Sequence, residues 1–254
     1  MQLIFEITWN CPAKCKHCTV PKGNVIIDLE LYERALKLFR NLKSEMSVVL
    51  SGGEPTTIPW LDKYVGLAKN LGYSVTVVTN GFFPDTALYS GADLIEVSVD
   101  YWGTKHNENR GVKGLWNHIN YLLQKGKGRV VIRATLLNDN YEDLLKIHEN
   151  YPDIPMLVMP VRGYVIKPPK KHLEALAKLD NVYIANNCPA GISSFVIAPG
   201  LNPEKELDVL ACIFYRKLLG RLRKFTEDEL EKILEEGRKL PRFPCEKQYT
   251  SNIQ

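Results

Sequence analysis

The sequence has no long apolar segment and no block of like charge. No run of apolar residues approaches the roughly 20 that a bilayer-spanning helix needs, and Met1–Glu6 lacks the basic start and cleavage signal of a secretory leader. We therefore expect a cytoplasmic protein. The 33 basic and 29 acidic residues give a formal charge of +4 and are spread along the chain, so the charge pattern does not indicate a nucleic-acid-binding surface.

Cysteine is scarce, with six in 254 residues, which disfavours a disulfide framework. Such frameworks belong to small secreted domains, whereas this chain is long enough to bury a full core. In a reducing compartment, clustered cysteines more often bind metal. Three of the six fall within eight residues, directly after an apolar run, in the order C-x3-C-x2-C: Cys11, Cys15 and Cys18.

Three thiolates in this order indicate a metal site with an open position. Thiolates are soft ligands that select zinc, Cu(I) or iron–sulfur clusters, and three of them leave one position of a four-iron cluster or of a zinc ion unfilled. A structural zinc site remains an alternative. Structural zinc sites, however, usually combine C-x2-C pairs with a fourth ligand at similar short spacing.

Short apolar runs alternate with helical patterns along the first 180 residues. β-branched runs predict strands, and apolar residues three and four apart predict helices. The alternation predicts parallel strands in βα units, buried on both faces. The expected strands are 3–8, 47–50, 74–78, 94–99, 129–136 and 155–159, and the expected helices are 29–41 (after an N-cap at Asp28), 60–71, 115–124, 141–150 and 170–178.

The chemically distinctive residues follow successive strands, where a βα barrel gathers its active-site loops. A doubly wound sheet fits the alternation too, but this placement favours an α/β fold with a partial (βα)6 TIM barrel over residues 1–181. The pattern breaks near Asp180, and residues 182–254 are expected to form a small C-terminal α+β extension. Within it we expect a hairpin over Ser194–Ala198 and a helix from an N-cap at Thr226 to about Lys239.

Polar motifs follow the second, third and fourth strands. In Ser51-Gly52-Gly53-Glu54-Pro55, two glycines would let the backbone approach a ligand closely, and Glu54 offers an acceptor. Thr79-Asn80-Gly81 follows the next strand, and alternation places Ser98 and Asp100 on one face at the end of the fourth. Taken singly, each motif is also compatible with a simple turn or cap.

The C-x3-C-x2-C loop, His17 before its third cysteine, and Gly-Gly-Glu-Pro one βα unit later resemble the radical S-adenosylmethionine (SAM) superfamily. The resemblance covers almost the whole chain. It implies that Cys11, Cys15 and Cys18 hold a 4Fe–4S cluster whose fourth iron binds the amino and carboxylate groups of SAM. An electron from an external donor such as ferredoxin or flavodoxin would then cleave SAM to a 5′-deoxyadenosyl radical, which abstracts hydrogen from a substrate.

The resemblance also implies a set of SAM contacts. Asp100 is expected both to bind the cofactor and to face the substrate as a catalytic residue. Arg133 lies in an apolar strand and needs a negative partner; we favour the carboxylate of SAM over an internal acid such as Glu54 or Asp100. The expected cofactor-binding residues are His17, Gly52, Gly53, Glu54, Thr79, Asn80, Ser98, Asp100, Arg133, Val158 and Met159.

The remaining cysteines, Cys188, Cys212 and Cys245, resemble a shortened SPASM or twitch extension. A full SPASM extension has more cysteines in close pairs, so at most one auxiliary iron–sulfur cluster is expected. Its fourth position would be left to substrate or to a non-cysteine residue. A zinc site and ordinary buried thiols remain open as alternatives.

The substrate class is not legible in the sequence. Proteins resembling this architecture often modify peptide or protein side chains, and others make cofactors or nucleotide-derived molecules. The Gly-Gly terminus of the molybdopterin-pathway relatives is absent, so we rank a peptide first. A non-catalytic iron–sulfur electron-transfer or zinc-binding module would not need polar residues arranged around an open iron.

His106 lacks metal-ligand spacing and is expected to lie on the surface or in helix packing.

Overall fold

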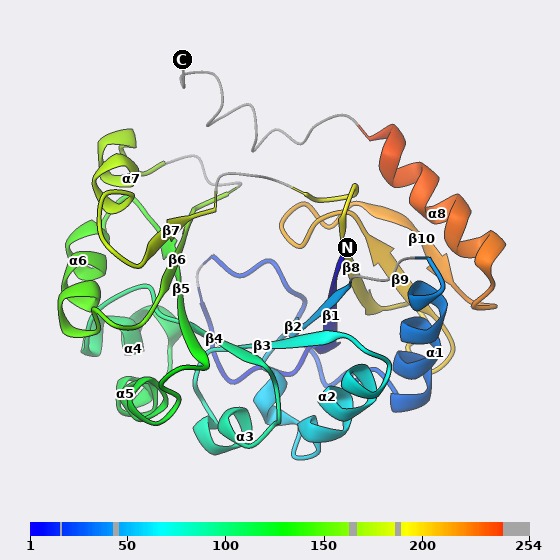
Figure 1. The fold of residues 1–254 in the computed structure, drawn as a ribbon, viewed down its shortest axis with the longest axis horizontal. Coiled ribbons are helices and arrows are strands. Elements are labelled where there is room, and N and C mark those ends of the chain that lie inside the picture. Colours follow the sequence, from blue (N-terminus) through cyan, green and yellow to red (C-terminus); the bar gives the residue numbers. More distant parts are fainter. Residues whose placement is uncertain (16, 43–45, 163–166, 186–188, 241–254) are drawn as a thin grey trace.

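One curved ten-stranded sheet organises the molecule (Figure 1). The structure is a computed structural model that describes residues 1–15, 17–42, 46–162, 167–185 and 189–240. The strand order is β10-β9-β8-β1-β2-β3-β4-β5-β6-β7. The strands are β1 (Gln2–Thr8), β2 (Ser47–Gly52), β3 (Ser74–Thr79), β4 (Leu94–Ser98), β5 (Val130–Leu136), β6 (Met156–Pro160), β7 (Val182–Ile184), β8 (Ser194–Pro199), β9 (Leu207–Leu210) and β10 (Leu218–Leu222).

Helices cover the outer, convex face of the sheet, and the loop after β1 lies inside the arc (Figure 1). Asp28 caps the first helix by accepting a hydrogen bond from the Glu30 N–H, and Thr226 caps the last, as the sequence predicted. The helices are α1 (Leu29–Arg40), the 3-10 helix η1 (Pro55–Thr57), α2 (Leu61–Asn70), α3 (Pro84–Leu88), α4 (Thr104–Arg110), α5 (Leu115–Lys125), α6 (Tyr141–Asn150), α7 (Lys170–Leu176) and α8 (Glu227–Lys239).

The partial barrel of parallel βα units is confirmed. Neighbouring strands from β1 to β7 pair in parallel, each reached through an outer helical crossover. The six predicted units are joined by a seventh short parallel strand, β7, which the sequence reading left out. Because β7 has only three residues, it is too short to show a strand period. The sequence also did not predict helices α3 and α4, because five and seven residues are too few to show a helical period.

The predicted hairpin over Ser194–Ala198 is wrong. These residues form one strand, β8, which pairs in parallel with β1 and antiparallel with β9. The strand is buried along its whole length, because β1 and β9 pair with its two edges and alternate side chains pack into apolar clusters on its two faces. The C-terminal extension therefore continues the same sheet beside β1. The domain boundary near residue 182 stays a prediction.

Two large apolar clusters line the sheet, besides a small one around Val196, Ala198 and Leu210. One packs β4, β5 and β6 against α5 and α6. The other joins β1, β2, β3, α1 and α2 to side chains of the extension, including Phe195, Leu207 and Leu230. Residues far apart in the sequence thus share a core. This core fixes the extension against β1, the edge strand of the barrel. In the part of the chain that the structure describes, no helix is long and apolar enough to cross a membrane.

Candidate SAM and iron–sulfur site

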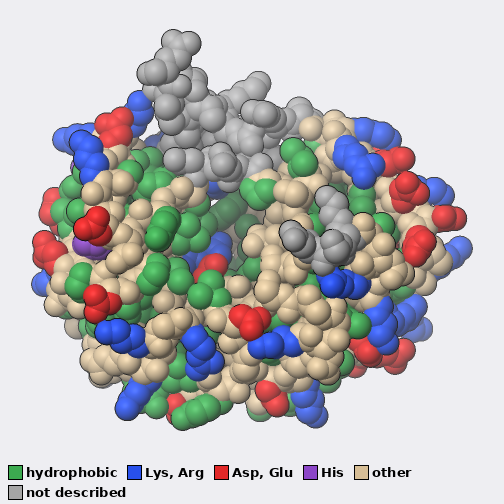
Figure 2. Space-filling model, viewed as in Figure 1, with side chains coloured by type: hydrophobic (Ala, Val, Ile, Leu, Met, Phe, Trp, Pro, Cys, Tyr) green, Lys and Arg blue, Asp and Glu red, His purple; other side chains and the backbone are tan. Residues whose placement is uncertain are grey.

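The strand ends and the cysteine loop enclose a cavity of about 150 Å³. In Figure 2 the molecule is hollowed near the centre of this face, with acidic and basic side chains visible inside. The cavity gathers most residues that the sequence singled out. Its walls include Cys11, Cys15, His17, Cys18, Gly52, Gly53, Glu54, Thr79, Asn80, Ser98, Asp100, Arg133 and Met159.

Gly52, the last residue of β2, and Gly53 pack against the protein's own backbone. A Cβ on Gly53 would lie 2.2 Å from the carbonyl oxygen of Asn10, and one on Gly52 would lie 2.3 Å from that of Thr8. Gly53 N–H donates to the Thr8 carbonyl at 2.6 Å, and Glu54 N–H donates to the Asn10 carbonyl at 2.8 Å. The glycines thus hold the start of the cysteine loop, besides lining the cavity as expected.

Glu54 is buried, 1% exposed, and its carboxylate is well supplied with donors. Thr56, through its N–H and hydroxyl, and the Thr79 hydroxyl donate to Oε1, while the Asn80 N–H donates to Oε2 at 2.6 Å. Burial raises the pKa of the carboxyl, although these hydrogen bonds oppose the shift. Oε2, with one donor, retains acceptor capacity, and Glu54 lines the cavity.

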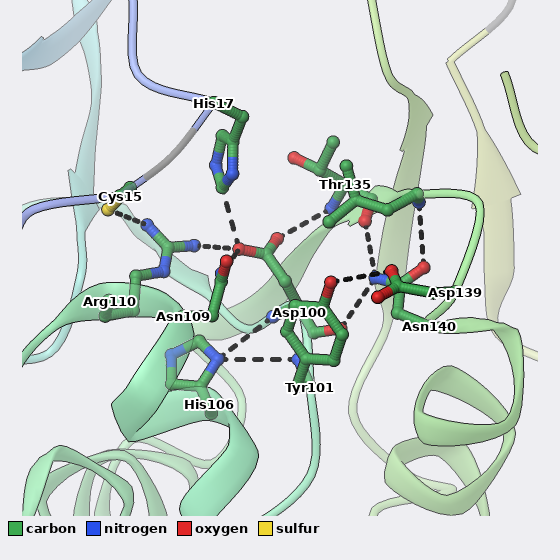
Figure 3. A network of polar contacts seen from close by, with 11 residues as sticks. Cys15, His17, Asp100, Tyr101, His106, Asn109, Arg110, Thr135, Asp139 and Asn140 are labelled. Carbon is green, nitrogen blue, oxygen red and sulfur yellow. Dashed lines mark hydrogen bonds and ion pairs between the residues drawn. The ribbon is translucent and has the colours of Figure 1, made fainter. Parts of the chain in front are cut away.

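Asp100 lies at the centre of a polar network (Figure 3). Its Oδ2 accepts from Nη2 of Arg110 at 2.5 Å and lies 3.8 Å from Nε2 of His17, and its Oδ1 accepts from the Thr135 N–H at 2.9 Å. Burial alone would raise the pKa of Asp100, but the Arg110 charge and these contacts outweigh it and lower the pKa. The carboxylate is therefore held ionised.

Arg110 and His106, both on α4, are site residues that sequence reasoning missed. Arg110 is 7% exposed, lines the cavity and donates from Nη1 to Sγ of Cys15 at 3.4 Å. His106 is fully buried, and its Nδ1 accepts from the N–H groups of Asp100 and Tyr101 at 3.3 and 3.4 Å. The sequence offered one sign of them: a histidine and an arginine four residues apart, in the segment that follows Ser98-Val99-Asp100. That spacing places two polar side chains on one face of a helix.

Arg133 has an internal partner that the sequence reading did not name. Its Nη1 lies 2.6 Å from Oε2 of Glu96, one strand away, instead of pairing with Glu54 or Asp100. Both side chains also line a second cavity, of about 230 Å³, in the lumen of the barrel. The two cavities share walls, among them Arg133 and Met159. A SAM contact for Arg133 stays a prediction.

Val158 is not brought to the cavity. Its side chain is buried in the cluster under α5 and α6, and its carbonyl accepts from the N–H of Ala185 at 2.9 Å. Met159, the next residue, faces the lumen instead, because side chains alternate along a strand. Of these two expected cofactor-binding residues, only Met159 lines the cavity.

The donors around the cysteine loop fit thiolates that hold a cluster. Besides Arg110, the Asn80 amide lies 3.7 Å from Sγ of Cys11, and hydrogen bonds to sulfur are a recurrent feature of iron–sulfur sites. The three cysteines are free thiols, as is Cys212, which is buried in the wall of the lumen cavity. Within the described residues, no group of His, Cys, Asp and Glu could hold a single metal ion. Cys188 and Cys245 lie outside the described residues.

Two curated proteins and a solved structure illustrate what the chain is similar to. It is 30% identical over 121 residues to an S-adenosylmethionine-dependent nucleotide dehydratase of Lacinutrix mariniflava, covering 41% of this chain and 24% of that protein. It is 35% identical over 82 residues to a PqqA peptide cyclase of Streptomyces rochei, covering 31% and 22%. The chain thus spans about a quarter of either protein.

Among solved structures, Streptococcus suis SuiB bound to the precursor peptide SuiA superimposes with a TM-score of 0.67 at 18% identity, covering 91% of this chain and 63% of SuiB. This likeness concerns the fold. The family model of the radical SAM superfamily matches residues 5–151, the segment that carries the cysteine loop, the Gly-Gly-Glu-Pro motif, Asp100 and Arg110. The chain therefore belongs to the radical SAM superfamily of enzymes.

Proposed function

We propose that this chain reductively cleaves SAM at a 4Fe–4S cluster and uses the resulting radical to modify a peptide or protein side chain. The observation that carries the proposal is the convergence of three free thiols with buried, ionised Asp100 and with Glu54 on one cavity. When bound, the cluster and SAM supply one-electron cleavage to methionine and a 5′-deoxyadenosyl radical, with the electron coming from a donor such as ferredoxin or flavodoxin.

The protein's own residues would bind and orient these groups. Cys11, Cys15 and Cys18 would ligate three irons. Glu54 lines the cavity, and its Oε2, which has one donor and spare acceptor capacity, would accept from the ammonium group of SAM. Asp100 would contact the cofactor beside the substrate, at the position that Arg110 and Thr135 fix for it.

Other wall residues would contact the carboxylate, the ribose and the adenine. Arg133 would bind the SAM carboxylate by exchanging or sharing its contact with Glu96. Ser98 lines the same wall, where the ribose would lie. Met159 would border the adenine. Arg133 and Met159 also line the lumen cavity, so these residues would hold SAM at the wall that the two cavities share.

The lumen cavity is the proposed substrate site, because it borders the thiol cavity directly. Ser51, Ile213 and Phe214 line both cavities together with Arg133 and Met159. Ile213 and Phe214 come from the extension, and the Ile213 carbonyl accepts from the Thr19 hydroxyl at 3.0 Å. The extension would therefore cover the radical and hold the substrate against it. Similarity to a peptide cyclase and to a peptide-bound enzyme supports a peptide substrate.

A second candidate substrate class is a nucleotide or another small molecule in cofactor biosynthesis. Similarity to the nucleotide dehydratase supports it. The gene's neighbourhood distinguishes the two classes. We expect a neighbouring short open reading frame whose peptide changes mass when incubated with the reconstituted enzyme, SAM and dithionite. A neighbourhood of cofactor-biosynthesis genes, with no mass change in any encoded peptide, would favour the small molecule.

Production of 5′-deoxyadenosine tests the proposed chemistry. After anaerobic reconstitution with iron and sulfide, the wild-type chain with dithionite and SAM should form 5′-deoxyadenosine and methionine. Glu54→Gln should lose at least tenfold, because it weakens the ammonium contact, whereas Glu30→Gln on the outer helix α1 should retain wild-type activity. Absence of 5′-deoxyadenosine above background in the cluster-loaded wild type would contradict the proposal.

An auxiliary cluster held by Cys188, Cys212 and Cys245 is a further part of the proposal. Buried Cys212 faces the lumen cavity, so a cluster there would lie beside the substrate. The variant with Cys11, Cys15 and Cys18 all changed to Ala should retain iron and sulfide after reconstitution. If it retains none, the extension acts only as a cover.

A further inference from the structure

The last turn of α4 packs directly against the cysteine loop. The Arg110 carbonyl accepts from the Lys14 N–H at 2.7 Å. Gly111, which ends the helix in a left-handed conformation (φ +64°), lies so close that an added Cβ would be 3.3 Å from the Lys14 Cβ. Backbone contacts thus fix the Arg110 side chain relative to Cys15.

The Arg110 guanidinium joins the Asp100 carboxylate to the sulfur of Cys15. Nη2 donates to Asp100 at 2.5 Å and Nη1 donates to Sγ of Cys15 at 3.4 Å (Figure 3). Its third nitrogen, Nε, has no hydrogen-bond partner among the described residues, although the side chain is buried. The planar guanidinium carries N–H donors in fixed directions, so it can contact the carboxylate and the sulfur at once. A lysine ammonium is a single compact charge and could not span both partners.

Asp100 keeps the guanidinium in place. A buried cation without a partner is costly, so the ion pair with Asp100 is what allows Arg110 to remain beside the thiol. Asp100 is in turn oriented by the Thr135 N–H. The positive guanidinium of the pair therefore contacts Cys15 directly, and the negative carboxylate lies behind it.

We infer that Arg110 is a positioning residue that raises the reduction potential of the cluster held by Cys11, Cys15 and Cys18. The inference rests on the proposed function. Adding one electron to a cluster held by these thiols, from [4Fe–4S]²⁺ to [4Fe–4S]⁺, adds one negative charge beside Arg110. A hydrogen-bond donor and a positive charge at the Cys15 sulfur stabilise that charge, and both are known determinants of cluster potentials.

Potentiometric titration followed by electron paramagnetic resonance, without SAM, tests this inference. We expect Arg110→Met to lower the ratio of reduced to oxidised cluster at a fixed potential at least tenfold, which is about 59 mV for one electron. Arg110→Lys keeps the charge but not the fork, and should shift the ratio in the same direction by less. Asp100→Asn keeps an acceptor for Nη2 in its amide oxygen but removes the negative charge behind the guanidinium, so it should shift the ratio the opposite way.

The matched control is Arg221→Met. Arg221 also forms an ion pair, with Asp208 at 2.8 Å, but on the outer strands β9 and β10. Its removal should leave the potential unchanged. If Arg110→Met fails to hold a full cluster, Arg110→Lys and Asp100→Asn decide the question. A wild-type potential in every Arg110 and Asp100 variant that holds a full cluster would overturn the inference.

Failure of the inference is distinct from failure of the proposed function. A wild-type chain that takes up no 4Fe–4S cluster, or that holds one and leaves SAM intact, would contradict the proposed function. A wild-type chain that cleaves SAM, together with Arg110 variants of unchanged potential, would contradict the inference alone.

Discussion

At the scale of single residues, the site depends on buried polar groups that have one defined protonation state. His106 accepts from two backbone N–H groups through Nδ1, so it must be neutral there. Burial, with the nearby Arg110 charge, lowers the pKa of His106 to about 3. The neutral imidazole thus orients the turn that carries Asp100. Because it carries no positive charge, it leaves the Asp100 carboxylate to pair with Arg110.

His106 makes the stability of the fold depend on pH. In the unfolded chain an imidazole binds a proton below about pH 6.5, whereas folded His106 stays neutral to about pH 3. Lowering the pH from 7.5 to 5.5 therefore favours the unfolded state by roughly 1 kcal/mol through this residue. Urea unfolding of His106→Gln should lack that component, while His148→Gln on α6 should retain it. Identical pH slopes for His106→Gln and wild type would contradict this account.

Gly53 offers a second test at the residue scale. A Cβ there would lie 2.2 Å from a backbone oxygen of the cysteine loop, so Gly53→Ala must displace the loop or the motif after β2. We expect a loss of about 1–3 kcal/mol in the free energy of unfolding and reduced iron uptake. Gly66 in α2 has nothing within 4 Å of such a Cβ, so Gly66→Ala should be neutral or stabilising. Normal iron uptake by Gly53→Ala would count against the packing role.

The sequence predicted which residue types line the cavity but not every reason for them. Glycines after β2 were expected to admit a ligand, and the close neighbours are Thr8 and Asn10 of the same chain. Arg133 was expected to need an anion, and the anion present is Glu96. Such partners depend on the register between strands, which periodicity within one strand does not contain.

Among the helices and strands, α4 contributes most to the network around Asp100, yet the sequence did not predict it. Seven residues give two turns, too few for an apolar period, and the helix carries mainly polar side chains. Longer elements with clear periods, such as α1, α6 and α8, were predicted within one or two residues. The network around Asp100 could not be assembled from sequence, because its members come from the cysteine loop, α4 and β5.

The turn between β9 and β10 is joined to β1 by an ion pair whose carboxylate is buried and whose arginine is partly exposed. Arg216 donates to both carboxylate oxygens of Glu6, at 2.5 and 2.9 Å, and Glu6 is 0% exposed. Arg216→Ala would leave this carboxylate buried without its cation and should lower the free energy of unfolding by about 3 kcal/mol or more. Chemical denaturation measures the change.

The control for Arg216 is again an ion pair on the same strands. Arg221 and Asp208 are both partly exposed, so Arg221→Ala should cost about 1 kcal/mol or less. Equal effects of the two substitutions would show that the Glu6 contact contributes no more than a surface pair.

At the scale of the whole molecule, the barrel and its extension form one continuous sheet around two adjoining cavities. The expected partial barrel followed from strands and helices alternating along the chain, and the cavity at the strand ends followed from parallel pairing. That β8 would lie beside β1 did not follow, because the pairing of distant strands is set by tertiary packing. This pairing brings Ile213 and Phe214 to the walls of both cavities.

The response of the reduced cluster to SAM shows whether SAM binds at the cluster held by Cys11, Cys15 and Cys18. The wild-type chain, reconstituted and reduced with dithionite, should show a 4Fe–4S electron paramagnetic resonance signal that changes when SAM is added. The variant with Cys11, Cys15 and Cys18 changed to Ala should show no SAM-sensitive signal, whatever the remaining cysteines bind. A wild-type spectrum without a cluster signal, or one that is the same with and without SAM, would contradict the account.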